Sequence, residues 1–357
     1  MRCLTLADAL AANGADCRFI CRAHEGNLIA FIRAKGYLVH ELPVVAQDNT
    51  VSLPGAEPAC QPEPVHAHWL GATQAQDAEA CAMLLSQQRA DWLIVDHYGI
   101  DARWQQALAP YYHRLMVIDD LADRQHLCHL LLDQTYGRQA EDYRPLVPAD
   151  CQVLAGAHYA LLRPEFAALR QYSLQRRATP AMRRLLLNMG GVDKDNATGQ
   201  VLQALRHTAL PPDCQITVVM GPTAPWRQQV AEQARTMPWP TQVLAGVSNM
   251  AQLMAESDLA IGAAGATSWE RCCLALPTVM VTLAENQLTI ANNLSTSGAA
   301  DLILLTDLQD LATVSLFGNL DALAEMSVRA AAVTDGLGVL RVLNYLLSDN
   351  HENQCTV

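Results

Sequence analysis

The sequence lacks any hydrophobic run long enough to cross a membrane. Its longest apolar stretches are interrupted by Asp, Glu or Arg before they reach the roughly 18 uninterrupted residues of a membrane-spanning helix. The pattern of a secretory signal peptide is also missing from its first residues. The sequence therefore predicts a cytoplasmic protein without a membrane partner.

Aromatic residues and positive charge are both scarce. Phe, Trp and Tyr make up 5% of the 357 residues, and 24 Lys and Arg against 36 Asp and Glu give a formal net charge of −12. This balance argues against a nucleic-acid partner, and 51% hydrophobic against 17% charged residues argues against disorder. With so few aromatics, the apolar content must be largely Ala, Leu and Val, which favours a helix-rich α/β protein.

No Cys-x-x-Cys pair is present, although the sequence contains 11 cysteines. The thiols lie within apolar runs, which is typical of reduced core residues. Two pairs of nearby histidines, His66 with His68 and His126 with His129, have no convincing third ligand close in sequence. We therefore expect neither a metal nor another cofactor.

Helical and strand-like hydrophobic patterns alternate along the chain. Helices are expected at 3–13, 27–35, 74–88, 228–235, 250–256 and 267–276, from residue 197 onward, and in the tail at 320–347. Strands are expected at 17–21, 37–42, 91–96, 114–119, 130–133, 185–189, 215–220, 241–244, 258–261 and 278–282. This alternation is typical of parallel sheets covered by helices, so we predict an α/β fold with a ligand crevice at the carboxyl ends of the strands.

The length suits two such domains of about 150 residues each. An Arg-rich segment at 163–184 predicts a linker helix between domains at 1–162 and 185–347, with a tail at 348–357. The first domain begins with a helix, whereas a doubly wound domain normally begins with a central strand and a phosphate-binding turn. We therefore expect a strand and its turn to precede Met1.

Two turns in the second half are candidate ligand sites. Gly190 and Gly191 lie between a strand and a helix, where glycines let the backbone approach a ligand and helix N–H groups bind an anion. An ordinary strand-to-helix turn would show the same pattern. Around the second turn, Thr267 and Ser268 can cap a helix and donate to phosphate, while Glu270 can accept from two ribose hydroxyls or simply favour the helix dipole.

In the first half, His97 and Tyr98 follow a predicted strand. An imidazole and a phenol at the carboxyl end of a strand suit proton transfer or substrate orientation, although a structural role fits equally well. Asp119 and Asp120 are adjacent carboxylates in an extended segment, so they should point to opposite faces. We therefore do not assign them as an acid–base pair.

Taken together, these segments resemble the bacterial UDP-2,4-diacetamido-2,4,6-trideoxy-β-L-altropyranose hydrolases of the pseudaminic acid pathway, which is linked to flagellin glycosylation. The resemblance covers almost the whole chain and rests on residues 2–7, 96–100, 118–122, 132–134, 159–166, 189–191, 196, 269–270 and 285–287. The family is similar in fold to MurG-type nucleotide-sugar glycosyltransferases. It implies a GT-B architecture of two Rossmann-like domains, UDP held by the C-terminal half, and metal-free hydrolysis of the bond between the sugar and UDP.

The resemblance also implies roles for individual residues, with Glu270 at the ribose and the backbone around Val247 near uracil. The implied UDP-sugar contacts are Gly190, Gly191, Asn196, Val247, Gly265, Ala266, Thr267, Glu270, Asn286, Gln287 and Arg163. The catalytic candidates within the chain are Tyr98 and His97. The family's base is a His in a Gly-x-Gly-His segment whose position would lie before Met1, so we expect catalysis to depend on that segment.

Two alternatives stay open: a UDP-sugar-dependent glycosyltransferase of MurG-like fold and an inactive UDP-sugar-binding protein. A hydrolase releases UDP and free sugar without an acceptor, whereas a transferase requires one. The acidic net charge argues against a membrane-surface patch for a lipid-linked acceptor, which favours the hydrolase. The sequence makes no prediction of the oligomeric state.

Overall fold

A computed structural model describes residues 1–45, 62–284 and 287–348, and the chain divides into two compact units. Unit 1 comprises Met1–Leu161 with Val339–Val357, and unit 2 comprises Leu162–Gly338. The division differs from the expected boundaries at two places. The helix predicted as a linker belongs to unit 2, and the chain returns to unit 1 at residue 339.

Unit 1 contains two separate parallel sheets. Its helices are α1 (Arg2–Ala12), α2 (Ile29–Ala34), α3 (Gln74–Leu85), α4 (Ala102–Leu108) and α12 (Gly338–Ser348). Its strands are β1 (Arg18–Arg22), β2 (Leu38–Leu42), β3 (Ala90–Val95), β4 (Tyr112–Ile118), β5 (Leu130–Asp133) and β6 (Gln152–Ala155). β1 pairs with β2, and the other four pair in the order β3-β4-β5-β6. Within the described residues, β1 and β3 each have one edge without a strand partner.

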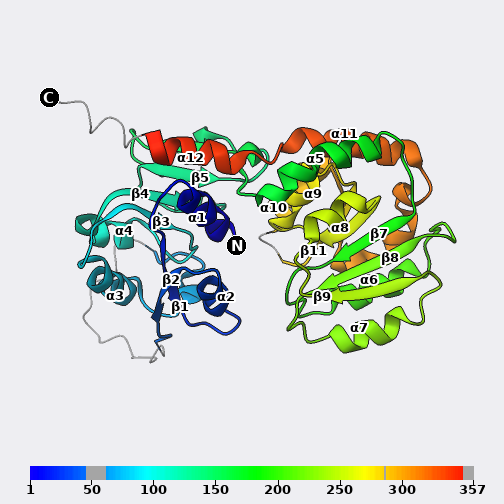
Figure 1. Cartoon of the computed structure of the whole chain (residues 1–357), viewed down its shortest axis with the longest axis horizontal. Coiled ribbons are helices and arrows are strands. Elements are labelled where there is room, and N and C mark those ends of the chain that lie inside the picture. The colour runs from blue at the N-terminus through cyan, green and yellow to red at the C-terminus, as the bar shows by residue number, and fades with distance from the viewer. Residues whose placement is uncertain (46–61, 285–286, 349–357) are drawn as a thin grey trace. The chain divides into compact units, whose positions relative to one another are not determined.

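Helix α12 is held to unit 1 by its apolar face. Val342 and Leu346 are buried in one cluster with Met116 of β4 and Leu130 of β5, and the indole nitrogen of Trp92 donates to the carbonyl of Leu346 at 3.2 Å. Figure 1 shows this helix, in red, beside the larger sheet of unit 1. Burial of this face explains why the end of the chain belongs with its beginning.

Unit 2 is built around one six-stranded parallel sheet. Its helices are α5 (Pro164–Arg177), α6 (Ala197–Leu205), α7 (Arg227–Ala234), α8 (Met250–Glu256), α9 (Thr267–Cys273), α10 (Leu288–Thr296) and α11 (Leu320–Val333). Its strands are β7 (Arg184–Asn188), β8 (Gln215–Met220), β9 (Thr241–Ala245), β10 (Leu259–Ala263), β11 (Thr278–Thr282) and β12 (Asp301–Leu304). The strand order is β12-β11-β10-β7-β8-β9.

This order reverses direction between β7 and β10. The chain adds β8 and β9 on one side of β7, then crosses over to build β10, β11 and β12 on the other side. Doubly wound sheets bind ligands at such a switch point, beyond the carboxyl ends of the two central strands. The turns after β7 and β10 are therefore the places in unit 2 to look for a site.

Most expected elements are confirmed within two or three residues, but four were missed: α4, β6, α10 and β12. The strands β6 and β12 have four residues each, and β12 begins with Asp301, so neither carries a clear hydrophobic signal. Short elements of this kind are set by their neighbours in the sheet rather than by their own sequence.

One segment, Leu320–Ser348, is long and apolar enough by composition to cross a membrane, but half of its most apolar stretch is buried inside the protein. It is also divided, because α11 ends at Val333 and α12 begins at Gly338. Leu323 and Met326 of α11 belong to the core of unit 2.

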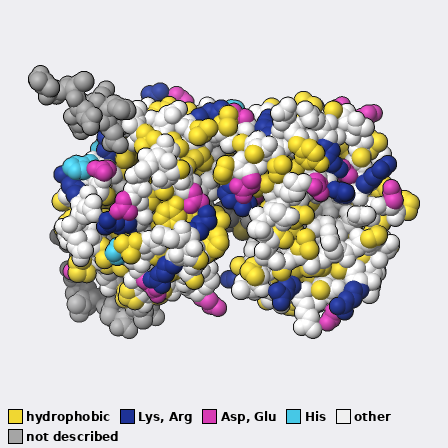
Figure 2. All heavy atoms as spheres, in the orientation of Figure 1, with side chains coloured by type: hydrophobic (Ala, Val, Ile, Leu, Met, Phe, Trp, Pro, Cys, Tyr) yellow, Lys and Arg dark blue, Asp and Glu magenta, His cyan; other side chains and the backbone are white. Residues whose placement is uncertain are grey.

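On the face drawn in Figure 2, basic and acidic side chains are interspersed over each unit.

Candidate functional site

The turn after β7 places two glycines at the switch point of unit 2. Gly190 adopts a φ of 95°, which favours glycine. Gly191 does not have a positive φ, and a Cβ added there would meet no atom within 4 Å. Neither the backbone conformation nor the surrounding protein therefore requires glycine at Gly191.

The turn after β8 packs against the turn after β7 and fixes its position. Gly221 follows β8, and a Cβ on Gly221 would lie 1.9 Å from the carbonyl oxygen of Gly191. Any side chain at Gly221 would push the first turn away from its place. The sequence analysis did not identify Gly221, because only the folded structure brings the two turns together.

Asp193 and Asn196 cap the helix that follows the first turn. The carboxylate of Asp193 accepts hydrogen bonds from the backbone N–H groups of Ala197 and Thr198, at 2.8 and 3.0 Å. The side-chain oxygen of Asn196 accepts from the N–H of Gly199 at 3.2 Å. Asn196 was expected beside the diphosphate or sugar, and in the structure its oxygen stabilises the start of α6.

The turn after β10 carries the second candidate glycine. A Cβ at Gly265 would also meet no atom within 4 Å, and its φ is not positive. The expectation that Thr267 and Ser268 cap the helix is wrong, since the N-cap residue of α9 is Ala266 and no side chain caps it. Both hydroxyls instead accept hydrogen bonds from the guanidinium of Arg271, and Ser268 is 1% exposed.

Glu270 lies on α9, directly after the buried Trp269. Burial raises the pKa of its carboxyl to about 7, against the opposing effect of the nearby Arg163 and Arg271. The side chain is 18% exposed, and one of its oxygens lies 3.8 Å from a guanidinium nitrogen of Arg163. A carboxylate at this position can accept hydrogen bonds from a ligand that enters beside α9.

The other predicted contacts in unit 2 lie on neighbouring loops. Arg163 precedes α5, pairs with Glu165 at 2.9 Å and lies over the ring of Phe166. Val247 lies in the loop after β9, at the same edge of the sheet as the two glycine turns. Gln287 follows β11, and its side-chain oxygen accepts from the N–H of Leu283 at 3.0 Å. Asn286 lies outside the described residues.

In unit 1, His97 and Tyr98 have different environments after β3. The Nδ1 atom of His97 accepts from the N–H of Gly99 at 2.9 Å, and burial lowers the pKa of the imidazole. Tyr98 donates its hydroxyl to a carboxylate oxygen of Asp120 at 2.7 Å, and burial beside this carboxylate raises the pKa of the phenol. The carboxylate of Asp120 holds the Tyr98 hydroxyl in place, so of the two side chains Tyr98 is the better suited to orient a substrate or a water molecule.

Arg2 joins two carboxylates beside Tyr98. Its guanidinium donates to both oxygens of Asp96 at 3.0 and 2.7 Å, and to both oxygens of Asp120 at 2.8 and 3.0 Å. Arg2 lies on α1, whereas Asp96 and Asp120 lie just beyond the carboxyl ends of β3 and β4. This network was missed because residues 94 and 118 positions apart meet only in the fold.

Asp119 points away from this network, as predicted for adjacent residues in an extended segment. Its carboxylate is fully buried and accepts from the hydroxyl of Tyr143 at 2.9 Å and from two backbone N–H groups. A nearby arginine, Arg124, lowers the pKa of this carboxyl despite its burial. Asp119 therefore stabilises the fold, and Asp120 alone of the pair reaches Arg2 and Tyr98.

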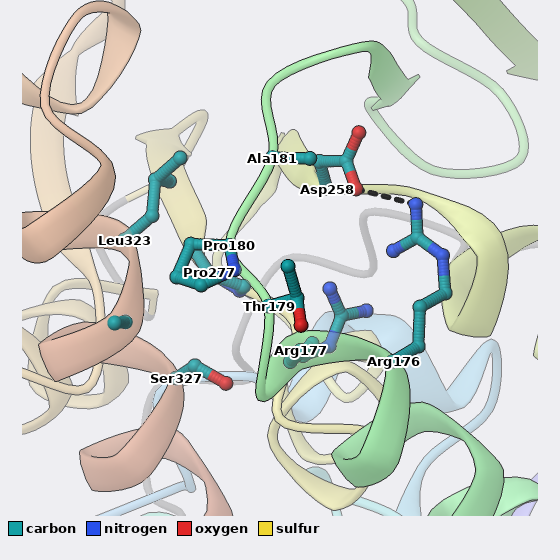
Figure 3. Close-up of a pocket in the computed structure, with 10 residues that line it drawn as sticks. Arg176, Arg177, Thr179, Pro180, Ala181, Asp258, Pro277, Leu323 and Ser327 are labelled. Carbon is teal, nitrogen blue, oxygen red and sulfur yellow. Dashed lines mark hydrogen bonds and ion pairs between the residues drawn. The ribbon is translucent and has the colours of Figure 1, made fainter.

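A small cavity in unit 2 lies away from the glycine turns. It has a volume of about 20 Å³, and its lining includes Arg176, Arg177, Asp258 and Pro277 (Figure 3). Asp258 precedes β10 and Pro277 precedes β11, so the cavity is at the amino-terminal edge of the sheet. It has room for about one water molecule at most and is too small for a nucleotide.

Parts of the chain are similar to known proteins. Residues 190–337 match the family described as glycosyltransferase family 28 C-terminal domain. The spore coat polysaccharide biosynthesis protein SpsG of Bacillus subtilis is 25% identical over 217 residues, 59% of this chain and 62% of that protein. The UDP-2,4-diacetamido-2,4,6-trideoxy-beta-L-altropyranose hydrolase of Campylobacter jejuni is 28% identical over 127 residues, 36% of this chain and 44% of that protein. The matched parts span less than two thirds of either relative.

Solved structures agree over nearly the whole chain. MurG of Acinetobacter baumannii has a TM-score of 0.70 at 15% identity, with 97% of this chain and 95% of that chain covered. The spinosyn rhamnosyltransferase SpnG has a TM-score of 0.54 at 16% identity, with 96% of each chain covered. The chain therefore has the GT-B fold of two Rossmann-like domains, as the sequence analysis predicted.

Proposed function

We propose that the chain binds UDP through unit 2 and takes part in hydrolysis of a UDP-linked 2,4-diacetamido-2,4,6-trideoxy-L-altrose, in the cytoplasm, to UDP and free sugar. One observation supports the nucleotide site above all. Gly191 and Gly265 lie beside the switch point of the sheet, and neither the backbone nor the packing requires glycine there. Space for a ligand explains both glycines.

The proposed nucleotide contacts follow from this placement. The diphosphate would lie over the open backbone at Gly190, Gly191 and Gly265, as anions do beyond the central strands of such sheets. The ribose hydroxyls would donate to the carboxylate of Glu270, which is largely buried and lies 3.8 Å from the guanidinium of Arg163. Val247 and Gln287 line the same edge of the sheet.

The choice of hydrolysis rests on the similarity to the Campylobacter enzyme and on the proposed sugar side of unit 1. Tyr98, held by Asp120 and Arg2, would orient the sugar or the attacking water. The base would be the histidine that the resemblance implies before Met1; within the described chain the carboxylates beside Tyr98 are bound by Arg2. Departing UDP needs no metal if turn N–H groups stabilise its charge.

A glycosyltransferase remains a second candidate, favoured by the family 28 match in unit 2 and the likeness in fold to MurG. The two functions differ in their need for an acceptor. Incubation of the UDP-linked diacetamido sugar with protein that carries the upstream segment should release UDP and free sugar in equal amounts without an acceptor, whereas the 357-residue chain should release far less. Release only after an acceptor is added would support the transferase.

Binding of UDP can be measured separately from turnover. Titration calorimetry with UDP should give saturable binding to the 357-residue chain, and Glu270→Ala should weaken it by about tenfold or more, the loss of two charge-assisted hydrogen bonds. Unchanged affinity in this variant would remove Glu270 from the ribose. No binding by the unaltered protein would contradict the proposed function.

A further inference from the structure

Arg271 is a buried cation directly beneath the turn after β10. Its side chain belongs to α9, and the residue is 2% exposed. One terminal nitrogen donates to the carbonyl of Ala263 at 2.8 Å and to the hydroxyl of Ser268 at 3.0 Å. The other donates to the hydroxyl of Thr267 at 3.3 Å. The guanidinium thus holds both ends of the turn that contains Gly265.

The central strand is shaped to accept this guanidinium. A Cβ on Gly262 of β10 would lie 2.5 Å from a terminal nitrogen of Arg271 and 2.9 Å from the carbonyl oxygen of Asn188. Glycine within a buried strand normally weakens it, since it leaves a side chain unpacked. At Gly262 the missing side chain provides the space that Arg271 fills.

In the described parts of the chain no carboxylate lies within 4 Å of the Arg271 guanidinium, and of the carboxylates only that of the neighbouring Glu270 acts on it from farther away. The Nε of Arg271 is buried without a hydrogen-bond partner there. Burial lowers the pKa of the guanidinium to about 10, so it still carries its charge at neutral pH. A buried cation without a paired anion is costly, and an apolar side chain would fill the same space more stably. The fold alone therefore does not account for Arg271.

We propose that Arg271 supplies the positive charge that makes this turn prefer a diphosphate. The proposal rests on the proposed binding of UDP. Because the guanidinium itself is buried, its charge is weakly screened, and it attracts an anion at the open backbone of Gly265 without touching it. The helix α9 has only seven residues, so the positive potential is assigned to Arg271 and not to the helix dipole. Arg271 is a positioning residue, because its own nitrogens bind the turn.

The test compares charge with shape at this position. Arg271→Gln retains hydrogen-bonding groups but removes the charge, whereas Arg271→Lys retains the charge. Calorimetric affinities for UDP and for uridine, which lacks the diphosphate, are measured for each protein. We expect Arg271→Gln to lose about tenfold or more in affinity for UDP and less than about twofold for uridine. Arg271→Lys should stay within about threefold of the unaltered protein for both ligands.

Arg177 provides the matched control. It is another buried arginine of unit 2, and it donates to the carbonyls of Leu274, Ser257 and Met254 at 2.9, 2.8 and 3.0 Å. Arg177→Gln should lower the melting temperature without changing the ratio of UDP to uridine affinity. The proposal would be overturned if Arg271→Gln lost affinity for UDP and uridine equally. It would also be overturned if Arg271→Gln and Arg271→Lys had the same two affinities.

A second variant covers the case in which Arg271→Gln does not fold. Gly262→Ala keeps the charge in the chain but displaces the guanidinium from beneath the turn. In folded Gly262→Ala protein, a selective loss of UDP affinity is expected, and an unchanged ratio of the two affinities would overturn the proposal. If the unaltered protein binds UDP, failure of either test concerns Arg271 alone, whereas absence of UDP binding would defeat the proposed function itself.

Discussion

Arg163 approaches Glu270 to 3.8 Å, which is close enough for attraction but too far for a hydrogen bond. Arg163 is bound more closely to Glu165, at 2.9 Å. Burial of the Glu270 carboxyl raises its pKa to about 7, although the charges of Arg163 and Arg271 oppose this shift. A ligand that donates two hydroxyl groups would favour the ionised form of Glu270.

This predicts that UDP binds more tightly as the pH rises from 6 to 8. At pH 6 most of the Glu270 carboxyl is protonated, so binding must first remove a proton, whereas at pH 8 the acceptor is already ionised. Calorimetry across this range should show the affinity rise in the unaltered protein. The phosphate of UDP titrates nearby, so Glu270→Gln is the control, and it should show a clearly smaller change with pH. Parallel profiles in the two proteins would contradict the assignment.

The same carboxyl should make the ligand-free protein less stable at higher pH. The pKa of Glu270 is raised from 4.5 in the unfolded chain to about 7 in the folded protein. Between these values the folded state binds more protons, so the contribution of Glu270 to stability is largest below about pH 4.5 and is lost as pH rises through 7. Chemical denaturation should show Glu270→Gln gaining stability relative to the unaltered protein from pH 5 to 7.5. A constant difference would refute the raised pKa.

The open space at Gly191 and Gly265 predicts that alanine at either position weakens UDP binding without destabilising the protein. Gly191→Ala and Gly265→Ala should change the free energy of unfolding by less than about 1 kcal/mol, because no protein atom meets the added methyl group. Each should weaken UDP binding by about tenfold or more, as the methyl group enters the space of the ligand. Gly318→Ala is the control, since Gly318 in unit 2 also has open surroundings. Unaltered UDP binding in both turn variants would show that another ligand or no ligand occupies this edge.

The sequence was sufficient to predict the alternation of helices and parallel strands, because buried strands such as β5 and β11 each contain three consecutive apolar residues. It also located the turns at Gly191 and Gly265, since each directly follows such a run. It did not predict that α12 returns to unit 1. The apolar periodicity of that helix shows that it is buried, but the residues it packs against, such as Met116, lie far away in sequence.

The candidate site was predicted less completely than the fold. Arg271 follows Glu270 in a helix that is otherwise uncharged and mostly buried, but the space at Gly262 that receives its side chain is visible only in three dimensions. Thr267 and Ser268 were expected to cap a helix because their residue types favour that role. Arg271 binds both hydroxyls instead, so a tertiary contact overrides the local preference.

Tyr98 should matter for turnover and not for UDP affinity. Its hydroxyl donates to Asp120, and Tyr98→Phe removes this bond and any contact with the sugar or water. In protein that carries the upstream segment, kcat should fall by about tenfold to a hundredfold, while UDP binding stays unchanged. Tyr37→Phe is the control, because Tyr37 in unit 1 also donates to a carboxylate, that of Asp8, at 2.7 Å. Equal turnover in the two variants would exclude Tyr98 from the reaction.

The two sheets of unit 1 have edges that a further strand would cover. Strands β1 and β3 each have an edge without a strand partner in the described part of the chain, and an unpaired strand edge leaves backbone groups without hydrogen-bond partners in the sheet. We propose that a strand before Met1 pairs with both edges and that the turn after it carries the base. Protein with about 20 further in-frame upstream residues, the length of a strand and a turn, should melt at a higher temperature and hydrolyse the UDP-sugar.

Replacement of the upstream histidine by Gln should abolish turnover of the extended protein and leave its higher melting temperature, which separates the catalytic part of the segment from its structural part. The added turn would end at α1, which begins at Arg2. If the extended protein melts at the same temperature as the 357-residue chain and is no more active, both the strand and the base must be sought elsewhere.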